Sequence, residues 1–444
     1  MPVVDVPDPE FMQDEEIAIF RDAVGKFYEQ HAPAKRVEKW REDGQVEAEF
    51  WREAGAAGLL GMTVPVEYGG HGGDFRHDLV VLDQQAEKGV DGFAASLHNV
   101  IILPYVVRHG TEEQKKKWLP KLVSGELISA IAMTEPGAGS DLQSITTTAI
   151  KDGNGYRLSG AKTFISSGQL ANFIIVVAKT DPKEGAKGIS LMCLETEGAE
   201  GFRRGKKLDK IGQDASDTSE LFFDDVFIPG DNVLGGVEGR GFYQLMGELP
   251  QERLVIAMNA IAGIEKALDV TVDYVKNRKA FGKTIWDFQN TQFVLADLKA
   301  RGTAARVFVN DCIAKLLEGK LDVATASMAK YWVTELQSEV VDMRQKLREH
   351  HGVDNAEVKH AAGGVVDLEF ISQYLVLAYA SKFPALYQYS DNIRILDAAV
   401  VAGLMPAAQA GLLQQAYQDL RGVSHRLTLE PVDTTDLPDV SAAM

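Results

Sequence analysis

The chain has 444 residues, enough for two to four domains, and its apolar fraction of 45% allows large buried cores. Acidic residues outnumber basic ones by 64 to 46, which gives a net charge of −18. Phosphate-rich surfaces repel such a chain, which argues against a main role on nucleic acid or on an anionic membrane. The composition is typical of an ordinary globular protein.

The cysteines and the N-terminal stretch further restrict the class of protein. The two cysteines, Cys193 and Cys312, lie far apart in the sequence, so neither a disulfide framework nor a cysteine-based metal site is indicated. The N-terminal stretch is rich in Asp and Glu, unlike a basic targeting peptide. No apolar run approaches the ~18 residues that a membrane helix needs. We therefore expect a cytoplasmic protein without a metal site or a membrane span.

The first region in chain order is expected to be helical and the second to be a sheet. Between residues 14 and 121, apolar residues recur every three or four positions. Between residues 127 and 234 the sequence contains short β-rich runs, such as 173–177 and 189–194, separated by turn residues. No helices alternate with these runs, which favours an antiparallel barrel or sandwich over a Rossmann sheet.

From Phe242 onward, in the third region, apolar residues again recur at helical spacing. Long helices are expected over residues 288–317 and 322–346. The predicted fold class is therefore α+β. The predicted domains are an N-terminal helical domain over 1–125, a middle β domain over 126–236, a C-terminal helical bundle over 237–342 and an atypical helical tail over 343–444.

A glycine-rich segment, AMTEPGAGSDL, occupies residues 132–142. Its glycines allow a ligand to approach the backbone, and Thr134 and Ser140 can donate hydrogen bonds to carbonyl or phosphate oxygens. The residues alone are equally compatible with a plain turn between a helix and a strand. A nucleotidyl-transfer site is not favoured, because the second carboxylate that would hold a metal ion beside Asp141 is missing.

This segment resembles the signature of the acyl-CoA dehydrogenase family, and later segments resemble the same family. Residues 164–168 (FISSG) are similar to its flavin-binding segment, and residues 211–229 are similar to the end of its middle domain. Residues 278–289 are similar to part of its C-terminal helical domain. The resemblance covers residues 14–342. It implies a subunit made of a helical domain, a β domain and a second helical domain that binds FAD. The implied reaction converts a medium-chain, long-chain or branched acyl-CoA thioester to the trans-2-enoyl-CoA and passes the electrons to an electron-transfer flavoprotein. The implied assembly is a homodimer or homotetramer.

The resemblance also implies roles for individual residues. Phe164 would pack against the isoalloxazine and Ser166 would form a hydrogen bond near its reactive edge, whereas the residues alone favour Phe164 as a core aromatic on a strand. Arg278 and Gln289 would reach the FAD of a neighbouring subunit, since a guanidinium suits a diphosphate; a solvated charge at a helix C-terminus is the alternative for Arg278. The implied cofactor-binding residues are Met133, Thr134, Gly139, Ser140, Phe164, Ile165, Ser166, Arg278, Phe281 and Gln289.

The implied reaction needs a carboxylate base in a dry pocket, where burial raises its pKa toward working pH. Residues 248–254 (ELPQERL) resemble the long-chain and isovaleryl branch of the family, whose base is the Glu of a Glu-Arg pair on this helix. Glu252 is thus the predicted base and Glu248 the second candidate, with Pro250 expected to kink the helix and turn Glu252 inward. The residues alone favour Glu252 as a glutamate on a solvated helix face. The implied substrate-binding residues are Ser140, Tyr243 and Arg253.

The family pattern ends near Asp342, and residues 343–430 resemble the helical end of glutamine synthetase adenylyltransferases. Asp367 and Glu369 resemble acidic positions of that family, but the Asp-x-Asp pair needed for two-metal nucleotidyl transfer is missing. The tail is therefore expected to be helical packing material. The resemblance implies that other family members have a different segment at the position of this tail, and that this segment contacts FAD. It also implies that the segment donates one backbone N–H hydrogen bond to the thioester carbonyl. Loss of one such donor costs on the order of 10²–10³ in rate.

Three hypotheses remain open from the sequence. The first is an acyl-CoA dehydrogenase that retains Glu252 as its base. The second is a catalytically weak protein that binds flavin or acyl-CoA. The third is a regulatory partner of glutamine synthetase that acts through the tail, which the missing metal-binding pair disfavours.

Overall fold

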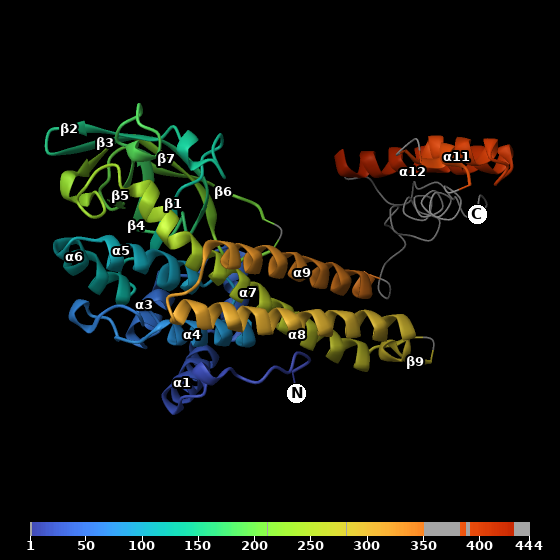
Figure 1. Cartoon of the computed structure of the whole chain (residues 1–444), viewed down its shortest axis with the longest axis horizontal. Helices are drawn as coiled ribbons and strands as arrows, with labels where there is room; N and C mark the ends of the chain where they lie inside the picture. Colours follow the sequence, from blue (N-terminus) through green and yellow to red (C-terminus); the bar gives the residue numbers. More distant parts are fainter. Residues whose placement is uncertain (1, 211, 281, 350–381, 388–390, 430–444) are drawn as a thin grey trace. The chain divides into compact units, whose positions relative to one another are not determined.

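The computed structural model describes residues 2–210, 212–280, 282–349, 382–387 and 391–429. Contacts between residues divide the chain into two units, residues 1–344 and residues 345–444. The first unit contains all the strands found in these described residues and most of the helices (Figure 1).

The N-terminal region is helical, as its apolar period predicts. Its elements are η1 (Glu10–Met12), α1 (Glu15–His31), α2 (Ala34–Asp43), α3 (Ala48–Ala56), η2 (Val66–Tyr68), α4 (Phe75–Lys88), the π-helix η3 (Ser96–Ile102), α5 (Leu103–His109) and α6 (Glu112–Val123). Helix α1 buries Ile17, Val24 and Phe27 and packs against α4. Side-chain caps set two helix starts, Asp74 for α4 and Thr111 for α6.

The middle region forms one seven-stranded sheet. Its elements are β1 (Ser129–Ala132), η4 (Leu142–Ser144), β2 (Thr148–Asp152), β3 (Gly155–Ser166), β4 (Phe173–Lys179), η5 (Ala186–Gly188), β5 (Ile189–Glu195), β6 (Phe202–Lys207), β7 (Thr218–Pro229) and η6 (Gly230–Asn232). The strand order is β1-β4-β2-β3-β7-β6, and β5 also pairs with β4. Both strands predicted from the apolar runs, β4 and β5, are buried along nearly their whole length.

The sheet is mixed, so the expected antiparallel pairing holds for most of its strands but not for all of them. Most neighbouring strands are antiparallel, but β4 runs parallel to β1 and, at one residue pair, to β2. A parallel pair needs a crossover connection, which is usually a helix. Here the connection between β1 and β4 contains the β2–β3 hairpin, so no helical period in the sequence marks the crossover.

Long helices follow the sheet where the sequence predicts them. The elements are α7 (Gly241–Asn277), β8 (Lys279–Ala280), β9 (Lys283–Thr284), η7 (Ile285–Asp287), α8 (Gln289–Leu317) and α9 (Val323–Glu349). Helix α7 continues through Pro250. This proline therefore does not end the helix, although it cannot donate a backbone hydrogen bond there.

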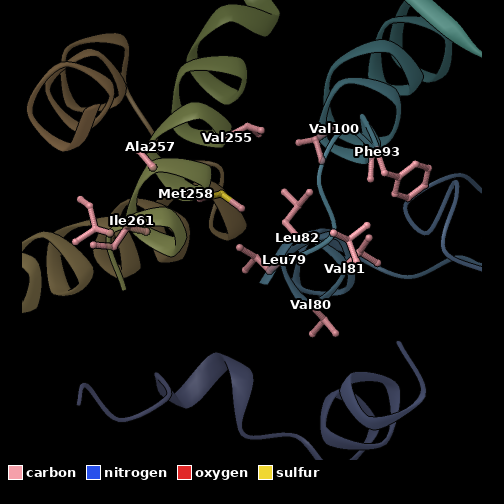
Figure 2. Close-up of a cluster of buried hydrophobic side chains, with 14 of the residues drawn as sticks. Leu79, Val80, Val81, Leu82, Phe93, Val100, Val255, Ala257, Met258 and Ile261 are labelled. Carbon is pink, nitrogen blue, oxygen red and sulfur yellow. The ribbon is translucent and has the colours of Figure 1, made fainter. Parts of the chain in front are cut away.

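A buried apolar cluster joins the N-terminal helices to α7. Figure 2 labels ten of its side chains: Leu79, Val80, Val81 and Leu82 of α4, Phe93, Val100 of η3, and Val255, Ala257, Met258 and Ile261 of α7. Full burial of one such valine, leucine, phenylalanine or methionine contributes roughly 1.5–3 kcal/mol. The cluster therefore fixes α7 against α4 and η3, next to the residues that form the candidate site.

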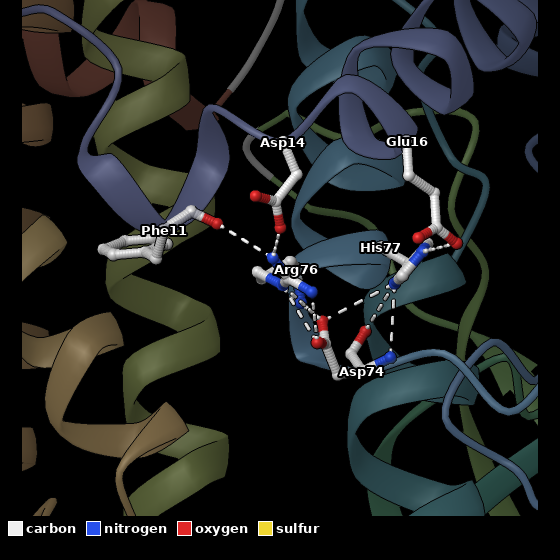
Figure 3. A network of polar contacts seen from close by, with 6 residues as sticks. All are labelled: Phe11, Asp14, Glu16, Asp74, Arg76 and His77. Carbon is white, nitrogen blue, oxygen red and sulfur yellow. Dashed lines mark hydrogen bonds and ion pairs between the residues drawn. The ribbon is translucent and has the colours of Figure 1, made fainter.

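A polar network holds the segment before α1 against the start of α4 (Figure 3). The Arg76 guanidinium donates to the Phe11 carbonyl at 3.2 Å and forms an ion pair with Asp14. It also forms an ion pair with Asp74 at 2.8 Å, and the Asp74 backbone N–H donates to His77 Nδ1 at 3.2 Å. The network ties the N-terminal segment to the helical region.

The described part of the second unit is helical. It contains η8 (Pro384–Tyr387), α11 (Asn392–Val401) and α12 (Ala407–Leu429). Helices α11 and α12 share a small apolar core that includes Ile395, Leu396 and Leu413. The acidic pair predicted from the tail resemblance, Asp367 and Glu369, lies outside the described residues.

Candidate active site

A buried ion pair organises the glycine-rich segment after β1. Lys162 Nζ lies 2.9 Å from Glu135 Oε1 and donates to the Met133 carbonyl at 2.9 Å. The backbone N–H groups of Thr146 and Thr147 donate to the Glu135 carboxylate at 2.6 and 3.0 Å. Burial alone would raise the pKa of Glu135, but the threonine hydrogen bonds and the Lys162 charge outweigh it and lower the pKa to about 2. The Glu135 carboxylate therefore ties the start of the loop that carries the glycines to its end at Thr146 and Thr147.

Next to this segment, strand β3 is bulged, and the bulge turns Phe164 outward. The register between β3 and β7 shifts between Lys162 and Ile165. Phe164 has a φ of 58°, in the left-handed region that disfavours a bulky side chain. Its ring is 67% exposed, so Phe164 is not the core aromatic that the residues alone favour. Ile165 is buried and Ser166 is exposed.

The bulge lies beside the glycine-rich segment, because the Thr163 N–H donates to the Thr134 carbonyl at 2.9 Å. Gly137 and Gly139 stand in open space, since a Cβ at either position would meet no heavy atom within 4 Å. Ser140 is exposed. An exposed aromatic ring, hydroxyl groups and open backbone in one place fit a cofactor with a flat ring system and a polar tail.

Helix α7 presents the predicted base, Glu252, to helix α5. The Tyr105 hydroxyl donates to Glu252 Oε1 at 2.7 Å, and Tyr105 is fully buried. Burial is the main cause that raises the pKa of Glu252 to about 7. The Glu248 charge also raises this pKa, whereas the Tyr105 hydrogen bond and the Arg253 charge lower it. Glu252 is thus not a solvated surface glutamate, and its carboxyl group can take up or release a proton near neutral pH.

Glu248, the second candidate for the base, has a different environment. Its carboxylate is buried, with the residue 4% exposed, and forms an ion pair with Arg108. His109 Nε2 lies 2.9 Å from its other oxygen. Two basic side chains therefore hold the Glu248 carboxylate, whereas a tyrosine hydroxyl contacts the carboxyl group of Glu252.

Sequence reasoning did not identify Tyr105, Arg108, His109 or Gln251 as members of this site. Gln251 Nε2 donates to the Val100 carbonyl, and its Oε1 accepts from Arg108, each at 2.8 Å. These contacts join positions about 140 to 150 residues apart in the chain. No local spacing signals them, because they exist only where α5 and η3 pack against α7.

A pocket of about 480 Å³ opens beside this cluster. Its lining residues are Arg108, His109, Leu234, Gly235, Val237, Arg240, Tyr243 and Gln244. The predicted substrate residue Tyr243 is 48% exposed, with the Arg240 guanidinium 5.9 Å from its ring centroid. The ionisable side chains of this lining, apart from the tyrosine hydroxyl, are basic, so the pocket suits an anionic group. The other two predicted substrate residues are Arg253, partly buried on α7, and Ser140 in the glycine-rich loop.

The remaining predicted cofactor residues lie at the other end of the long helices. Arg278 follows the last residue of α7, and the exposed Gln289 begins α8. Figure 1 shows this end, marked by β9, well away from the sheet. One chain therefore does not bring Arg278 and Gln289 to Phe164. The predicted residue Phe281 lies outside the described residues.

The described ranges hold no group of three or more His, Cys, Asp or Glu side chains arranged to bind a metal ion. Among the same residues, every helix is too short or too polar to cross a membrane.

Family models match nearly the whole chain. Residues 14–126, 130–226 and 239–360 match "Acyl-CoA dehydrogenase" as its N-terminal, middle and C-terminal domains, respectively. Residues 334–437 match "GlnD PII-uridylyltransferase". The tail thus matches a nucleotidyltransferase family, although the matched description names a uridylyltransferase rather than the expected adenylyltransferase.

Individual proteins show the same relationship. The chain is 46% identical over 324 residues to the long-chain specific acyl-CoA dehydrogenase of Sus scrofa, covering 72% of this chain and 75% of that protein. It is 42% identical over 300 residues to the isovaleryl-CoA dehydrogenase of Pongo abelii, covering 66% and 70%.

Solved structures agree with the sequence relatives. The crystal structure of an acyl-CoA dehydrogenase from Geobacillus kaustophilus has a TM-score of 0.73 at 45% identity, covering 76% of this chain and 88% of that one. A glutaryl-CoA dehydrogenase from Mycobacterium smegmatis in complex with FADH2 has a TM-score of 0.69 at 26% identity, covering 78% and 88%. The chain therefore belongs to the acyl-CoA dehydrogenase family, whose members are oxidoreductases that act on CH–CH bonds.

Proposed function

We propose that this protein is an FAD-dependent dehydrogenase that converts an acyl-CoA thioester to the trans-2-enoyl-CoA. The observation that carries the proposal is Glu252, a partly buried carboxyl group with a pKa raised to about 7 beside the pocket-lining helix α5. A carboxyl group with this pKa is partly ionised near neutral pH, so it can accept a proton from a substrate and release it again. The family's CH–CH chemistry gives such a base a substrate proton to remove.

In the proposed reaction, Glu252 accepts the proton from the α-carbon of the thioester. FAD held beside Phe164, Ser166 and the glycine-rich loop would supply the acceptor for the hydride that leaves the β-carbon. Overall, two C–H bonds would break and one C=C bond would form. Tyr243, Arg253 and Ser140 orient the acyl-CoA. The basic lining of the pocket beside Tyr243, which includes Arg108 and Arg240, supports binding of an anionic CoA group.

The proposed FAD site combines residues of two subunits. In one subunit Met133, Thr134, Gly139, Ser140, Phe164, Ile165 and Ser166 supply the exposed aromatic ring, hydroxyl groups and open backbone. A second subunit supplies Arg278, Phe281 and Gln289, since Arg278 and Gln289 of the same chain lie at the far end of α7 and α8. The protein would therefore act as a homodimer or homotetramer.

Two finer points rest on the family relationship. Similarity to a long-chain and to an isovaleryl enzyme supports a long-chain or branched acyl group as substrate. The proposed electron acceptor is an electron-transfer flavoprotein. The described residues favour neither of the two acyl types.

The test is an absorption spectrum of the purified full-length protein, followed by anaerobic addition of palmitoyl-CoA or isovaleryl-CoA. We expect bound flavin, bleaching of its visible absorption, and a product lighter than the substrate by two hydrogens. Bound flavin that neither ligand bleaches would instead support a catalytically weak binding protein. A protein that cannot be loaded with FAD would contradict the proposal.

A further inference from the structure

The carboxylate of Glu252 is held by a residue from a different domain. Tyr105 lies on α5, is fully buried, and donates its hydroxyl to Glu252 Oε1 at 2.7 Å. A buried hydroxyl usually has a hydrogen-bond partner, but this one is directed at the group that must gain and lose a proton. Its position therefore bears on how the base works.

A π-helical turn places Tyr105 opposite Glu252. The π-helix η3 runs from Ser96 to Ile102, directly before α5. Such turns are rare and change the face that the following helix presents. This one is anchored by buried hydrogen bonds: His98 Nε2 donates to the Leu122 carbonyl at 2.9 Å, and Asn99 Nδ2 donates to the Leu59 carbonyl at 2.8 Å.

A second set of hydrogen bonds joins α7 to η3 and α5 close to Glu252. Gln251, adjacent to Glu252, donates to the Val100 carbonyl of η3 and accepts from Arg108 of α5. The side chain of Gln251 is buried, and its bond to the Val100 carbonyl is shielded from water, whereas the bond from Arg108 is partly buried. The spacing between α5 and α7 is therefore set next to the base, and the Tyr105 hydroxyl has little freedom to move away from it.

The groups facing Glu252 are arranged around this hydrogen bond. Along α7, Glu248 and Arg253 are its charged neighbours, and from α5 Tyr105 is its hydrogen-bond partner. Arg108 and His109, also on α5, bind Glu248. Tyr105 is thus the neutral donor that favours the carboxylate form of Glu252 in a site where burial favours the protonated form.

We propose that Tyr105 is a positioning residue for Glu252, whose hydroxyl holds the carboxylate in one orientation and keeps it ready to accept the α-proton. The proposal rests on the proposed function of Glu252 as base. Tyr105 keeps its own proton throughout, because burial raises the pKa of its hydroxyl far above neutral. When Glu252 takes up the α-proton, the Tyr105 oxygen can accept a hydrogen bond from the new carboxyl O–H, so no further proton has to leave the site.

The test compares Tyr105→Phe with Tyr28→Phe in the full-length, FAD-loaded protein. Tyr28 is a matched control, because it is also fully buried but donates a hydrogen bond to the Val81 carbonyl, at 3.4 Å, in the interface of α1 and α4. Protonation of Glu252 is followed by infrared difference spectroscopy of its carboxyl C=O stretch, assigned by its loss in Glu252→Gln. This measurement needs no turnover.

Loss of a hydrogen bond to a charged group should raise the Glu252 midpoint in Tyr105→Phe by about one to two pH units. The rate of flavin reduction at pH 7 should fall by about tenfold or more and recover in part at higher pH. Tyr28→Phe should leave both the midpoint and the pH profile unchanged. An unchanged midpoint in folded Tyr105→Phe would overturn the positioning role, even if the variant lost thermal stability.

A second substitution tests the same hydrogen bond in the opposite direction. A fluorinated tyrosine at position 105 keeps the shape of the ring and makes the hydroxyl a stronger donor, so the Glu252 midpoint should fall. A midpoint that stays constant or rises would again contradict the proposal. Failure of the proposed function is distinguished by Glu252→Gln: if that variant reduces flavin at the normal rate, Glu252 is not the base, whatever the infrared midpoints show.

Discussion

Glu248 and Glu252 lie one helical turn apart on α7, yet the first is held by two basic side chains and the second by a tyrosine hydroxyl. The ionised Glu248 helps to raise the pKa of Glu252. Two carboxyl groups with similar sequence surroundings are thus given different properties by the helix that packs against them. This difference supports the proposal that Glu252 is the base and that the charge of Glu248 tunes its pKa.

The first prediction concerns the pH dependence of this pair. The proposed base Glu252 must be a carboxylate to accept a proton, so the rate of flavin reduction by substrate should rise with pH and reach half of its maximum near pH 7. Glu248→Gln removes a like charge, which should lower the Glu252 pKa and move the half-maximum to lower pH by about one unit. Anaerobic stopped-flow reduction between pH 5 and pH 9 measures both. A shift to higher pH would contradict the assignment.

Phe164 provides a prediction about cofactor binding. Phe164→Gly removes an exposed ring from a left-handed backbone position, so the stability of the apoprotein should be unchanged or raised by up to about 1 kcal/mol. FAD affinity should fall, because the ring is proposed to pack against the flavin. Urea unfolding and FAD titration measure the two effects.

A second phenylalanine controls for a general effect of losing a ring. Phe173 of β4 is fully buried, and Phe173→Ala should cost about 3–5 kcal/mol of stability. If Phe164→Gly destabilised the apoprotein as strongly and bound FAD normally, Phe164 would be a packing residue.

Asp78 gives a prediction that is independent of catalysis. It is buried in α4, its Oδ1 has no hydrogen-bond partner within the described part of the chain, and burial raises its pKa to about 7. The unfolded carboxyl group releases its proton near pH 4, so stability contributed by this group falls as the pH rises from about 4 to about 7. Asp78→Asn should therefore stabilise the protein by roughly 2–3 kcal/mol more at pH 8 than at pH 5.

Urea unfolding of wild type and Asp78→Asn at the two pH values measures this difference. Asp209→Asn is a suitable control, because the Asp209 side chain is fully exposed, at 97%. A gain for Asp78→Asn that is equal at both pH values would show that the carboxyl group is not protonated in the folded state.

The proposed two-subunit FAD site predicts complementation between variants that do not bind FAD on their own. Phe164→Gly and Arg278→Ala each damage one half of every site in their own homo-oligomers. A mixed oligomer contains some sites with Phe164 from one subunit and Arg278 from the other, and these sites should regain FAD binding. Mixing the two variants under subunit exchange and measuring bound flavin tests this. If flavin binding in the mixture equals the average of the separate variants, each site lies within one chain.

The order of helices, sheet and helices could be predicted because the spacing of apolar residues differs between the helical regions and the sheet. The strands β4 and β5 are runs of buried β-branched and other apolar residues, and α8 and α9 keep a helical period between clear turn signals. The parallel pairing of β1 with β4 could not be predicted, since the intervening hairpin carries no crossover signal.

The candidate site, like the fold, could be predicted only in part from the sequence. Glu252 and the glycine-rich segment each lie within a short continuous stretch of sequence, so resemblance to a family could identify them. Tyr105, Arg108 and Gln251 act through contacts between α5, η3 and α7, which only the packed structure brings together. The outward position of Phe164 depends on a bulge whose register shift involves β7, more than fifty residues later.

A single-turnover comparison distinguishes Glu252 from Glu248 as the group that removes the α-proton. Wild type, Glu252→Gln and Glu248→Gln are loaded with FAD and mixed anaerobically with the acyl-CoA that bleaches the wild type. Glu252→Gln should keep FAD and bind acyl-CoA but reduce flavin slower by a factor on the order of 10² or more, whereas Glu248→Gln should still reduce it with a shifted pH profile. Normal flavin reduction by Glu252→Gln, or its loss in Glu248→Gln alone at every pH, would show that Glu252 is not the base.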